Sequence, residues 1–365
     1  MGEKIKVGIL FGGKSAEHEI SILSAGNIIN AMDRDKYQVI LIGITKKGKW
    51  CIGRSAEIML RGGNNSGQDI SESDALTLIP GERDFKFVNP GGIEKVPEID
   101  VIFPVLHGPM GEDGTVQGFL KLAGIPFVGA GVLGSSVGMD KDVMKRLFRD
   151  SGIPVGRFRV ILSSEKDSVR FDEIAGELGL PLFIKPANLG SSVGVHKVDN
   201  KKDFDASLDD AFSFDNKVLI EEYIKGREIE CAVLGNEYPV ASVPGEISTD
   251  HDFYSYNAKY VDEKGAILHI PAKLPEDISA KIQDLSIKSF KAICCEGMAR
   301  VDCFLKEDGT ILVNEANTIP GFTSISMYPM LWKASGIPYD ELIDRLIILA
   351  MERQKKEKLL KTDYK

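Results

Sequence analysis

The chain has 365 residues, of which 43% are hydrophobic and 27% charged, and its formal net charge is −9 at pH 7. This composition is typical of a globular protein with two or three domains. Because its basic residues are scattered, we expect no nucleic-acid partner. No run of 18 apolar residues occurs, so we expect no membrane-spanning helix. The five cysteines lack disulfide or zinc spacing and no secretion signal is recognised, which favours a cytoplasmic location.

The first third of the chain alternates strand and helix patterns. Apolar runs at 5–13 and 37–45 predict strands, and the helical periodicity of 17–32 predicts a helix between them. A further strand, helix and strand are expected before residue 130. The pattern indicates a doubly wound α/β unit, whose ligands bind at the carboxyl ends of the strands. The segment between Trp50 and Pro97 is rich in Gly, Ser and Asn and is predicted to be a surface excursion.

The rest of the chain predicts two further lobes. Residues 135–152 predict one helix, closed by Gly152 and Pro154, which leads into a smaller α/β region. Longer β runs come next, then a helix at 275–295, a hairpin at 299–316 and closing helices. The charged tail from residue 351 is expected to be a solvated helix end. The predicted lobes are residues 1–122, 123–222 and 223–365.

The stretch GILFGGKS, residues 8–15, matches the phosphate-binding pattern G-x-x-x-x-G-K-[ST] letter for letter. Its three large apolar residues continue the preceding strand, and exposing them in a loop would forfeit about 1.5–3 kcal/mol of burial each. We therefore expect a turn at Gly12-Gly13, followed by a helix that begins near Glu17. That acid is either an ordinary helix-start residue or a carboxylate that binds a substrate ammonium.

A second glycine stretch, FIKPANLGSSVGVHKV, is a better candidate for a phosphate loop. A β run carries Lys185 and ends at Pro186, and small residues at 190–194 form a turn whose N–H groups can approach an anion. Lys185 would add a cation at the edge of this turn. Glycine-serine turns also join strands without binding any ligand, so this pattern alone leaves both interpretations open.

The segment ARVDCFLKEDGTILVNEAN, residues 299–317, predicts a hairpin with Asp308-Gly309 as a two-residue turn. In that register two facing pairs share one face of the hairpin: Asp302 with Glu315, and Arg300 with Asn317. Opposed carboxylates, with Cβ atoms about 4.5–5.5 Å apart, repel unless a cation lies between them. Their oxygens and the Asn amide suit Mg²⁺ completed by phosphate oxygens. The alternative is a polar face on which the arginine screens the acids.

Two loops supply further polar groups. The loop HGPMGEDG, residues 107–114, comes after a strand and opens a helix at its anion-binding end. Its His107 is either structural or functional. The loop TIPGFTS, residues 318–324, comes directly after the hairpin. Hydroxyl and N–H donors near this loop are Gly321, Thr323, Ser324 and Ser326.

These motifs resemble those of the D-alanine–D-alanine ligases of the ATP-grasp superfamily, and they follow one another along the chain in the same order as in that family. The stretches that match are HGPMGEDGTVQG, MARVDCFLKEDGTILVNEANTIPGFTSISMYP, EHEIS, KPANLGSSVGV, VLIEEYIKGREIE and FYSYNAKY. The resemblance covers nearly the whole chain and implies a three-lobed ATP-grasp fold with α/β and α+β parts. It implies a Rossmann-like domain at 1–122 and ATP-grasp subdomains at 123–222 and 223–365. Cys303 departs from the family's aliphatic residue, and the 51–96 excursion carries no family motif.

The resemblance implies an enzyme that uses ATP to join two D-alanines through an acyl phosphate, releasing ADP and phosphate, for peptidoglycan precursor synthesis. It implies lysines that hold the phosphates, a 190–194 turn that closes as a lid, and contacts to adenine and ribose. The ATP-binding residues implied are Lys141, Lys185, Ser192, Glu221, Ile224 and Glu228. The residues implied for two Mg²⁺ (or Mn²⁺) ions are Asp302, Glu315 and Asn317.

For the amino-acid substrates, the resemblance implies that Glu17 holds the first ammonium and forms a hydrogen-bonded strut with Ser191 and Tyr260. Arg300 and the N–H of Gly321 are implied to stabilise the tetrahedral oxyanion. The remaining substrate contacts implied are Ser326, for the second carboxylate, with His107 and Lys259.

Tyr260 ends the AKY motif, where depsipeptide ligases of the family tend to have Phe. It therefore favours a dipeptide ligase over a D-alanine–D-lactate ligase of the same fold. A P-loop NTPase that uses residues 8–15 is a rival from a different enzyme class. A nonenzymatic nucleotide-binding protein is a third rival, but it has no use for the carboxylates of the hairpin. The family also implies a homodimer, with no nucleic-acid or membrane partner.

Overall fold

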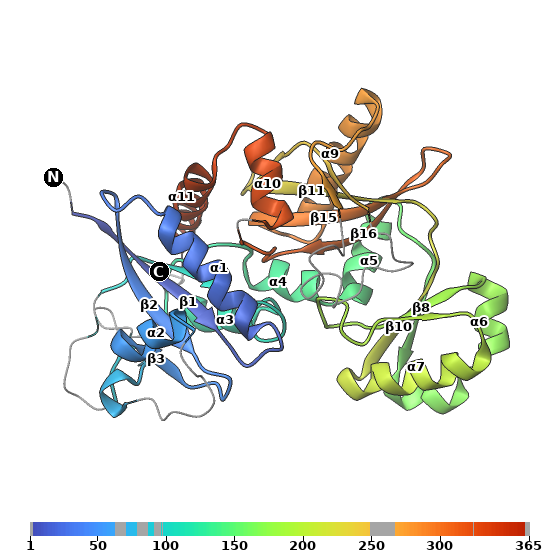
Figure 1. Cartoon of the computed structure of the whole chain (residues 1–365), viewed down its shortest axis with the longest axis horizontal. Coiled ribbons are helices and arrows are strands. Elements are labelled where there is room, and N and C mark those ends of the chain that lie inside the picture. The colour runs from blue at the N-terminus through green and yellow to red at the C-terminus, as the bar shows by residue number, and fades with distance from the viewer. Residues whose placement is uncertain are drawn as a thin grey trace.

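The structure is a computed structural model that describes residues 3–62, 71–78, 87–90, 96, 98–248, 267–323 and 325–361. Three larger sheets, of four, four and six strands, each form the centre of one lobe. Figure 1 shows the N-terminal lobe mainly in blue, the central lobe in green to yellow-green, and the C-terminal lobe mainly in yellow, orange and red. The predicted three-lobed fold with α/β and α+β parts is confirmed. No described helix is long and apolar enough to cross a membrane.

The N-terminal sheet has the strand order β3-β2-β1-β6, with β3 as an antiparallel edge strand beside three parallel ones. Its strands are β1 (Ile5–Gly12), β2 (Tyr37–Ile44), β3 (Trp50–Ile52) and β6 (Val101–Val105). Its helices are α1 (His18–Ala31), α2 (Gly53–Leu60) and α3 (Thr115–Leu122). Two short strands, β4 (Thr77–Leu78) and β5 (Phe87–Val88), pair with each other, and a 3-10 helix spans Glu72–Asp74.

Two predictions for this lobe were wrong. The predicted surface excursion begins with β3 and α2, whose Cys51, Ala56 and Met59 are buried, because this segment covers the sheet edge. The strand expected at 125–130 is only an isolated bridge between Phe127 and Ile102.

The predicted single helix at 135–152 is instead two helices, α4 (Val132–Met139) and α5 (Lys141–Asp150). Asp140 interrupts them because its backbone is extended, with φ −83° and ψ 99°. Its carboxylate accepts hydrogen bonds from the N–H groups of Asp142 and Val143 at 3.1 and 3.0 Å, as an N-cap does. Both helices pack into the core of the C-terminal sheet. As a result, α5 begins at the junction of the lobes.

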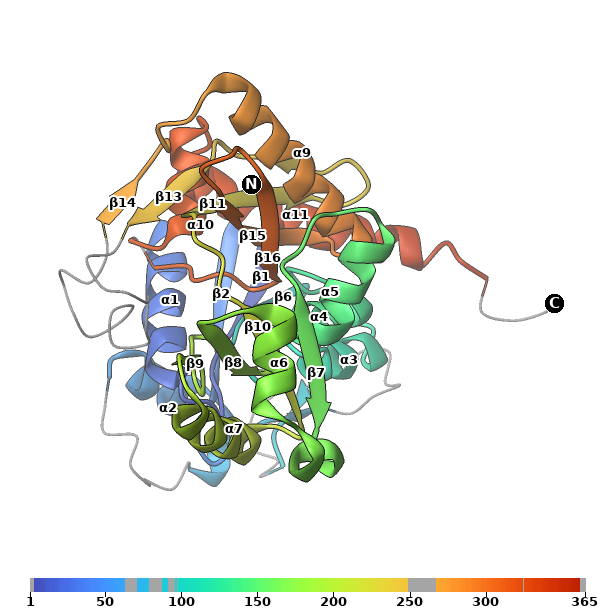
Figure 2. The same ribbon diagram turned by 90° about the vertical axis from the view of Figure 1, so that its right-hand side faces the viewer.

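The central sheet is antiparallel, with the strand order β7-β10-β8-β9. Its strands are β7 (Phe158–Leu162), β8 (Leu182–Pro186), β9 (His196–Val198) and β10 (Lys217–Glu222). Its helices are α6 (Phe171–Leu178), α7 (Lys201–Phe214) and a 3-10 helix (Ser163–Ser168), and Figure 2 shows α6 in front of the sheet and α7 below β8 and β9. Ile184 and Ile220 belong to the core beneath these helices. Because side chains alternate along a strand, the next residues, Lys185 and Glu221, point to the opposite face.

The C-terminal sheet has the order β14-β13-β11-β15-β16, with β12 added to β11. Its strands are β11 (Arg227–Gly235), β12 (Val240–Ala241), β13 (Gly245–Ser248), β14 (Ile267–His269), β15 (Gly297–Leu305) and β16 (Ile311–Asn317). Its helices are α9 (Glu276–Ala292), α10 (Met327–Ala334) and α11 (Tyr339–Glu357). Val301 lies in the core that contains residues of α9, whereas Met298 lies in the core that contains α10 and α11. Arg300 and Asp302 therefore lie on the face away from α9.

The last helix, α11, returns to the N-terminal lobe. Its Leu342 and Leu346 share a core with Val7 and Phe103 of the N-terminal sheet. The prediction of a solvated tail was wrong at Arg353, which is buried. Its guanidinium donates hydrogen bonds of 2.7 Å to the carbonyls of Phe127 and Gly129 and lies 4.5 Å from the Phe127 ring centroid.

Candidate active site

Glu17 and Ser191 bring the N-terminal and central lobes together. The side-chain hydroxyl of Ser191 donates a hydrogen bond to Oε1 of Glu17, which directly precedes α1. Gly108 approaches the same carboxylate, because a Cβ at this glycine would lie 3.0 Å from Oε2 of Glu17. Glu17 is thus the point where the turn after β1, the 107–114 loop and the 190–194 turn meet.

The 107–114 loop adds two titratable groups beside Glu17. His107 is buried, and burial lowers its pKa while the Glu17 carboxylate opposes that shift. The N–H of Gly108 donates a hydrogen bond of 2.7 Å to Oε1 of Glu112. Burial, aided by the Glu17 charge, raises the pKa of Glu112 to about 8. Sequence reasoning did not single out Glu112, although an acid in a glycine loop after a strand is a usable signal.

The two lysines predicted for phosphate approach the site from different elements, α5 and β8. Lys141 is the first residue of α5, and its Nζ donates a hydrogen bond of 2.6 Å to the Leu189 carbonyl. The same Nζ lies 3.7 Å from Oε2 of Glu315 in the C-terminal sheet. Burial lowers the pKa of Lys141, and Glu315 opposes this shift. Lys185 of β8 places its Nζ 2.8 Å from Oε2 of Glu221 on β10.

A third lysine, Lys145, was missed by sequence reasoning. Its side chain is 2% exposed, and its Nζ lies 3.2 Å from Oε1 of Glu221. Burial opposes ionisation of Glu221, but the charges of Lys145 and Lys185 outweigh it and lower the pKa of this carboxyl. The available signal was the spacing in KDVMK, because residues four apart share one face of a helix.

The 190–194 turn holds two serines in the left-handed region of backbone space. The φ angles are +52° at Ser191, +59° at Ser192 and +68° at Gly194. For residues other than glycine such angles cost on the order of 1–3 kcal/mol and persist where the surroundings enforce them. The turn predicted from its small residues is therefore present, and Ser191 is tied down by Glu17.

The β15–β16 hairpin confirms the predicted facing pairs but not the predicted turn. Arg300 pairs with Asn317 and Asp302 with Glu315. The two-residue turn was wrong: the N–H of Lys306 donates to the Thr310 carbonyl at 2.9 Å, which leaves three residues in the turn, with Gly309 at φ +82°. A register shift between Asp302 and Cys303 compensates for the extra turn residue.

On this hairpin face Arg300 binds the acids directly. Its Nε and Nη2 donate to the two Asp302 oxygens at 2.8 and 2.7 Å, and its Nε lies 3.0 Å from Oε2 of Glu230. Burial opposes the charge of Arg300, but Asp302 and Glu230 outweigh it and raise its pKa well above the usual value. Asn317 also donates to Oδ2 of Asp302 at 2.9 Å. The arginine therefore screens the carboxylates of Asp302 and Glu230.

The same residues fit a divalent cation only in part. Asp302, Glu315 and Asn317 offer carboxylate and amide oxygens, the ligands that Mg²⁺ prefers. Within the described part of the chain, no group of three or more His, Cys, Asp or Glu side chains is arranged to hold a metal. A cation at these residues would therefore need further oxygen ligands from outside the protein.

The loop after the hairpin is built closely around Gly321 and Ser326. Oγ of Ser326 accepts a hydrogen bond of 3.0 Å from the Thr323 N–H and lies 2.7 Å from the Thr323 hydroxyl. A Cβ at Gly321 would come within 3.0 Å of Oγ of Ser326. Ser324 lies outside the described residues.

The remaining candidates are less well defined. Glu228 lies on β11, opposite Phe304 of β15. Ile224 comes after β10 and packs against Gly156, where an added Cβ would lie 2.7 Å from its Cδ1. Lys259 and Tyr260 lie outside the described residues.

The GILFGGKS stretch is not a phosphate loop. Residues 8–12 are part of β1, and Ile9, Leu10 and Phe11 have no exposed surface. The turn lies at Gly12 and Gly13, with φ of +92° and +100°, as predicted. It leaves Lys14 exposed.

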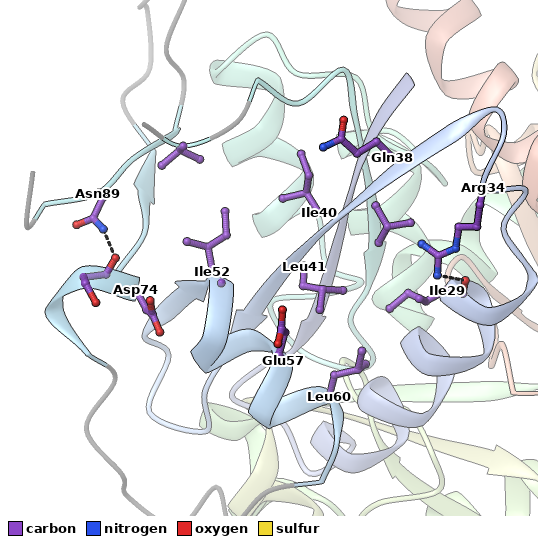
Figure 3. Close-up of a pocket in the computed structure, with 14 residues that line it drawn as sticks. Ile29, Arg34, Gln38, Ile40, Leu41, Ile52, Glu57, Leu60, Asp74 and Asn89 are labelled. Atoms are coloured by element: carbon purple, nitrogen blue, oxygen red, sulfur yellow. Dashed lines mark hydrogen bonds between the residues drawn. The ribbon is translucent and has the colours of Figure 1, made fainter. Parts of the chain in front are cut away.

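A separate cavity of about 510 Å³ lies beside the N-terminal sheet (Figure 3), and none of the predicted site residues lines it. Aliphatic side chains make up part of its walls, with Ile40, Leu41 and Ile52 facing it in Figure 3. Two of its charged groups have partners in the protein: Arg34 donates to the Ile29 carbonyl at 2.8 Å, and Asp74 accepts from the Ser55 hydroxyl at 2.6 Å. This cavity therefore lacks the convergent charges of the site at Glu17.

Comparisons with known proteins agree with this geometry. Residues 6–130 match the family described as D-ala D-ala ligase N-terminus, and residues 147–348 match D-ala D-ala ligase C-terminus. The chain is 53% identical to a D-alanine--D-alanine ligase of Oceanobacillus iheyensis over 360 residues, 98% of each protein. The solved D-alanine-D-alanine ligase of Coxiella burnetii superposes with a TM-score of 0.86 at 37% identity, covering 98% of this chain and 97% of that one. A D-Ala:D-Ser ligase of Enterococcus faecalis superposes with a TM-score of 0.84 at 36% identity, covering 95% of this chain and all of that one.

Proposed function

The chain belongs to the D-alanine–D-alanine ligase family, and from this premise we propose which of its residues carry out the reaction. The protein is an ATP-dependent ligase of the ATP-grasp fold that joins two D-alanines for peptidoglycan precursor synthesis. The observation that supports the residue roles best is the contact between Lys141 and Glu315, at 3.7 Å. It places a predicted phosphate lysine beside the carboxylates of the hairpin.

For ATP, we assign the phosphates to Lys141 and Lys185, with the 190–194 turn, including Ser192, as the lid. Glu221 and the backbone near Ile224 would contact adenine, and Glu228 the ribose hydroxyls. The lysines are buried, so their charges act on the phosphates with little screening by water.

Asp302, Glu315 and Asn317 would hold two Mg²⁺ (or Mn²⁺) ions together with phosphate oxygens. These ions would neutralise charge on the phosphates during transfer. Arg300 donates two hydrogen bonds to the Asp302 carboxylate. When a cation binds Asp302, this arginine must therefore share or release that carboxylate.

For the amino acids, Glu17 would hold the first ammonium while Ser191 and Tyr260 brace it. Attack by the second amine on the acyl phosphate gives a tetrahedral oxyanion. Arg300 and the Gly321 N–H would donate to it, because preorganised donors stabilise charge that develops in the transition state. Ser326 would bind the second carboxylate, and His107 and Lys259 would complete the substrate contacts.

The lobes proposed for these roles are residues 1–122, 123–222 and 223–365. We further propose a homodimer and, because all five cysteines are free thiols, a cytoplasmic location.

The test is ADP formation by the full chain with D-alanine, L-alanine, D-serine and D-lactate as substrates. We expect release of ADP with D-alanine alone, and a dipeptide product. D-Serine belongs in the panel because the chain resembles a D-Ala:D-Ser ligase, and D-lactate distinguishes a depsipeptide ligase. ADP formation that does not depend on any D-amino acid would overturn the assignment.

A further inference from the structure

Two buried lysines in the proposed nucleotide site, Lys145 and Lys185, share the carboxylate of Glu221. Lys145 Nζ lies 3.2 Å from Oε1 of Glu221, and Lys185 Nζ lies 2.8 Å from Oε2. The exposed fractions of the side chains are 2% for Lys145, 9% for Lys185 and 12% for Glu221. Two amino groups therefore meet one carboxylate, and burial lowers the pKa of Lys145 while the Glu221 charge opposes that shift.

The two lysines differ in what else they can reach. Lys185 lies at the end of β8, just before the 190–194 turn, and is proposed to bind the phosphates. Lys145 comes from α5 and lies 5.9 Å from the centroid of the Phe158 ring. In the described ranges, Glu221 is the carboxylate with which Lys145 forms an ion pair.

A phosphate that draws Lys185 away removes one of the two partners of Glu221. A buried carboxylate that loses its counter-ion is strongly unfavourable. Lys145 lies beside the other carboxylate oxygen, Oε1 of Glu221. Glu221 therefore stays paired while Lys185 moves, and the penalty is avoided. In agreement with this arrangement, the two lysines together lower the pKa of Glu221 despite its burial.

We propose that Lys145 is a positioning residue of the ATP site, which remains the counter-ion of Glu221 when Lys185 turns to the nucleotide phosphates. The inference rests on the proposed roles of Lys185 and Glu221 in ATP binding. In this scheme Lys145 touches no phosphate and acts through Glu221 alone.

The test compares ligands with and without phosphates on the variant Lys145→Met of the full chain. Titration calorimetry should show ADP affinity reduced at least tenfold and adenosine affinity changed less than twofold, because adenosine does not draw Lys185 away from Glu221. The KM for ATP should rise at least tenfold while the KM for D-alanine stays the same. The unfolding temperature without ligand should stay close to wild type, since Lys185 still pairs with Glu221.

Three further variants keep the test decisive. Lys288→Met removes an exposed lysine of α9 and should leave every value unchanged. Lys145→Arg keeps the charge and should bind ADP within threefold of wild type, a result that stands even if the Met variant fails to fold. In a Glu221→Gln background, Lys145→Met should cost less than twofold in ADP affinity, because the carboxylate to be paired is gone.

Equal losses for ADP and adenosine, or an undiminished loss in the Glu221→Gln background, would overturn the inference. So would a Lys145→Met variant that behaves like Lys288→Met. A wild-type protein that forms no ADP with D-alanine would instead refute the proposed function.

Discussion

The hydroxyl of Ser191 donates a hydrogen bond to the Glu17 carboxylate, although the two residues are 174 positions apart and lie in different lobes. The bond ties the 190–194 turn of the central lobe to the start of α1. Ser191 has a left-handed φ of +52°, so the turn depends on its surroundings for this conformation.

The variant Ser191→Ala should lower kcat/KM for D-alanine by roughly 10- to 150-fold. A hydrogen bond to a charged group contributes about 1.5–3 kcal/mol, and every 1.4 kcal/mol is about tenfold. Steady-state kinetics with ADP release as the readout measures the change. Ser168→Ala, at an exposed serine, is the matched control, and equal activity of the two variants would contradict a role for the bond.

The variant Gly321→Ala should reduce kcat by about tenfold or more. The new Cβ would lie only 3.0 Å from Oγ of Ser326, so the loop must shift, and a displacement of about 1 Å in an active site can cost 10²-fold. Gly176→Ala is the control, because Gly176 lies in α6 with open space around it and should gain about 0.5–1 kcal/mol in stability. If kcat of Gly321→Ala matches the control, the loop is not positioned for catalysis.

The variant Glu112→Gln should remove part of the dependence of stability on pH. Burial and the Glu17 charge raise the pKa of Glu112 from 4.5 to about 8 in the folded protein. A raised carboxyl pKa means that the folded state holds a proton more tightly than the unfolded state. Its contribution is therefore present below pH 4.5 and lost as the pH rises through about 8.

As the pH rises from 5 to 9, the free energy of unfolding of Glu112→Gln should increase relative to that of wild type, by roughly 2–5 kcal/mol in total. Urea unfolding at pH 5, 7 and 9 checks this trend. Glu173→Gln, at an exposed acid of α6, should track the wild-type pH curve. Parallel curves for wild type and Glu112→Gln would show that the carboxyl does not titrate in this range.

The variant Arg353→Met should destabilise the fold by about 2–4 kcal/mol, because it leaves the carbonyls of Phe127 and Gly129 without these donors. Denaturant unfolding measures the loss. Lys355→Met replaces an exposed residue of the same helix and should change stability by no more than about 0.5 kcal/mol. A loss of the same size in both variants would mean that the buried contacts contribute little.

Features that depend on alternation along strands were predicted best from the sequence. The facing of Asp302 with Glu315 depends on the period of two and on a nearby turn, and it is present in the structure. The turn itself has three residues, and the register is right only because a second irregularity lies between Asp302 and Cys303. Two compensating departures of this kind leave no trace in a pattern of apolar and polar residues.

Features that the sequence did not predict depend on partners that are distant in the chain. Arg353 resembles its charged neighbours in MERQKKEK, and only the carbonyls of Phe127 and Gly129 distinguish it. Lys145 likewise becomes a site residue because Glu221 lies beside it. Asp140 is different, since an acid followed by a helical pattern is a recognisable N-cap signal that periodicity outweighed.

The return of α11 to the first lobe has a consequence for how the protein is made. Leu342 and Leu346 complete a core that includes Val7 and Phe103, so part of the apolar surface of the N-terminal sheet stays uncovered until α11 has been synthesised. The core of the N-terminal lobe is therefore complete only when both ends of the described chain are present. A nascent chain that stalls before residue 339 would expose this surface to chaperones and proteases.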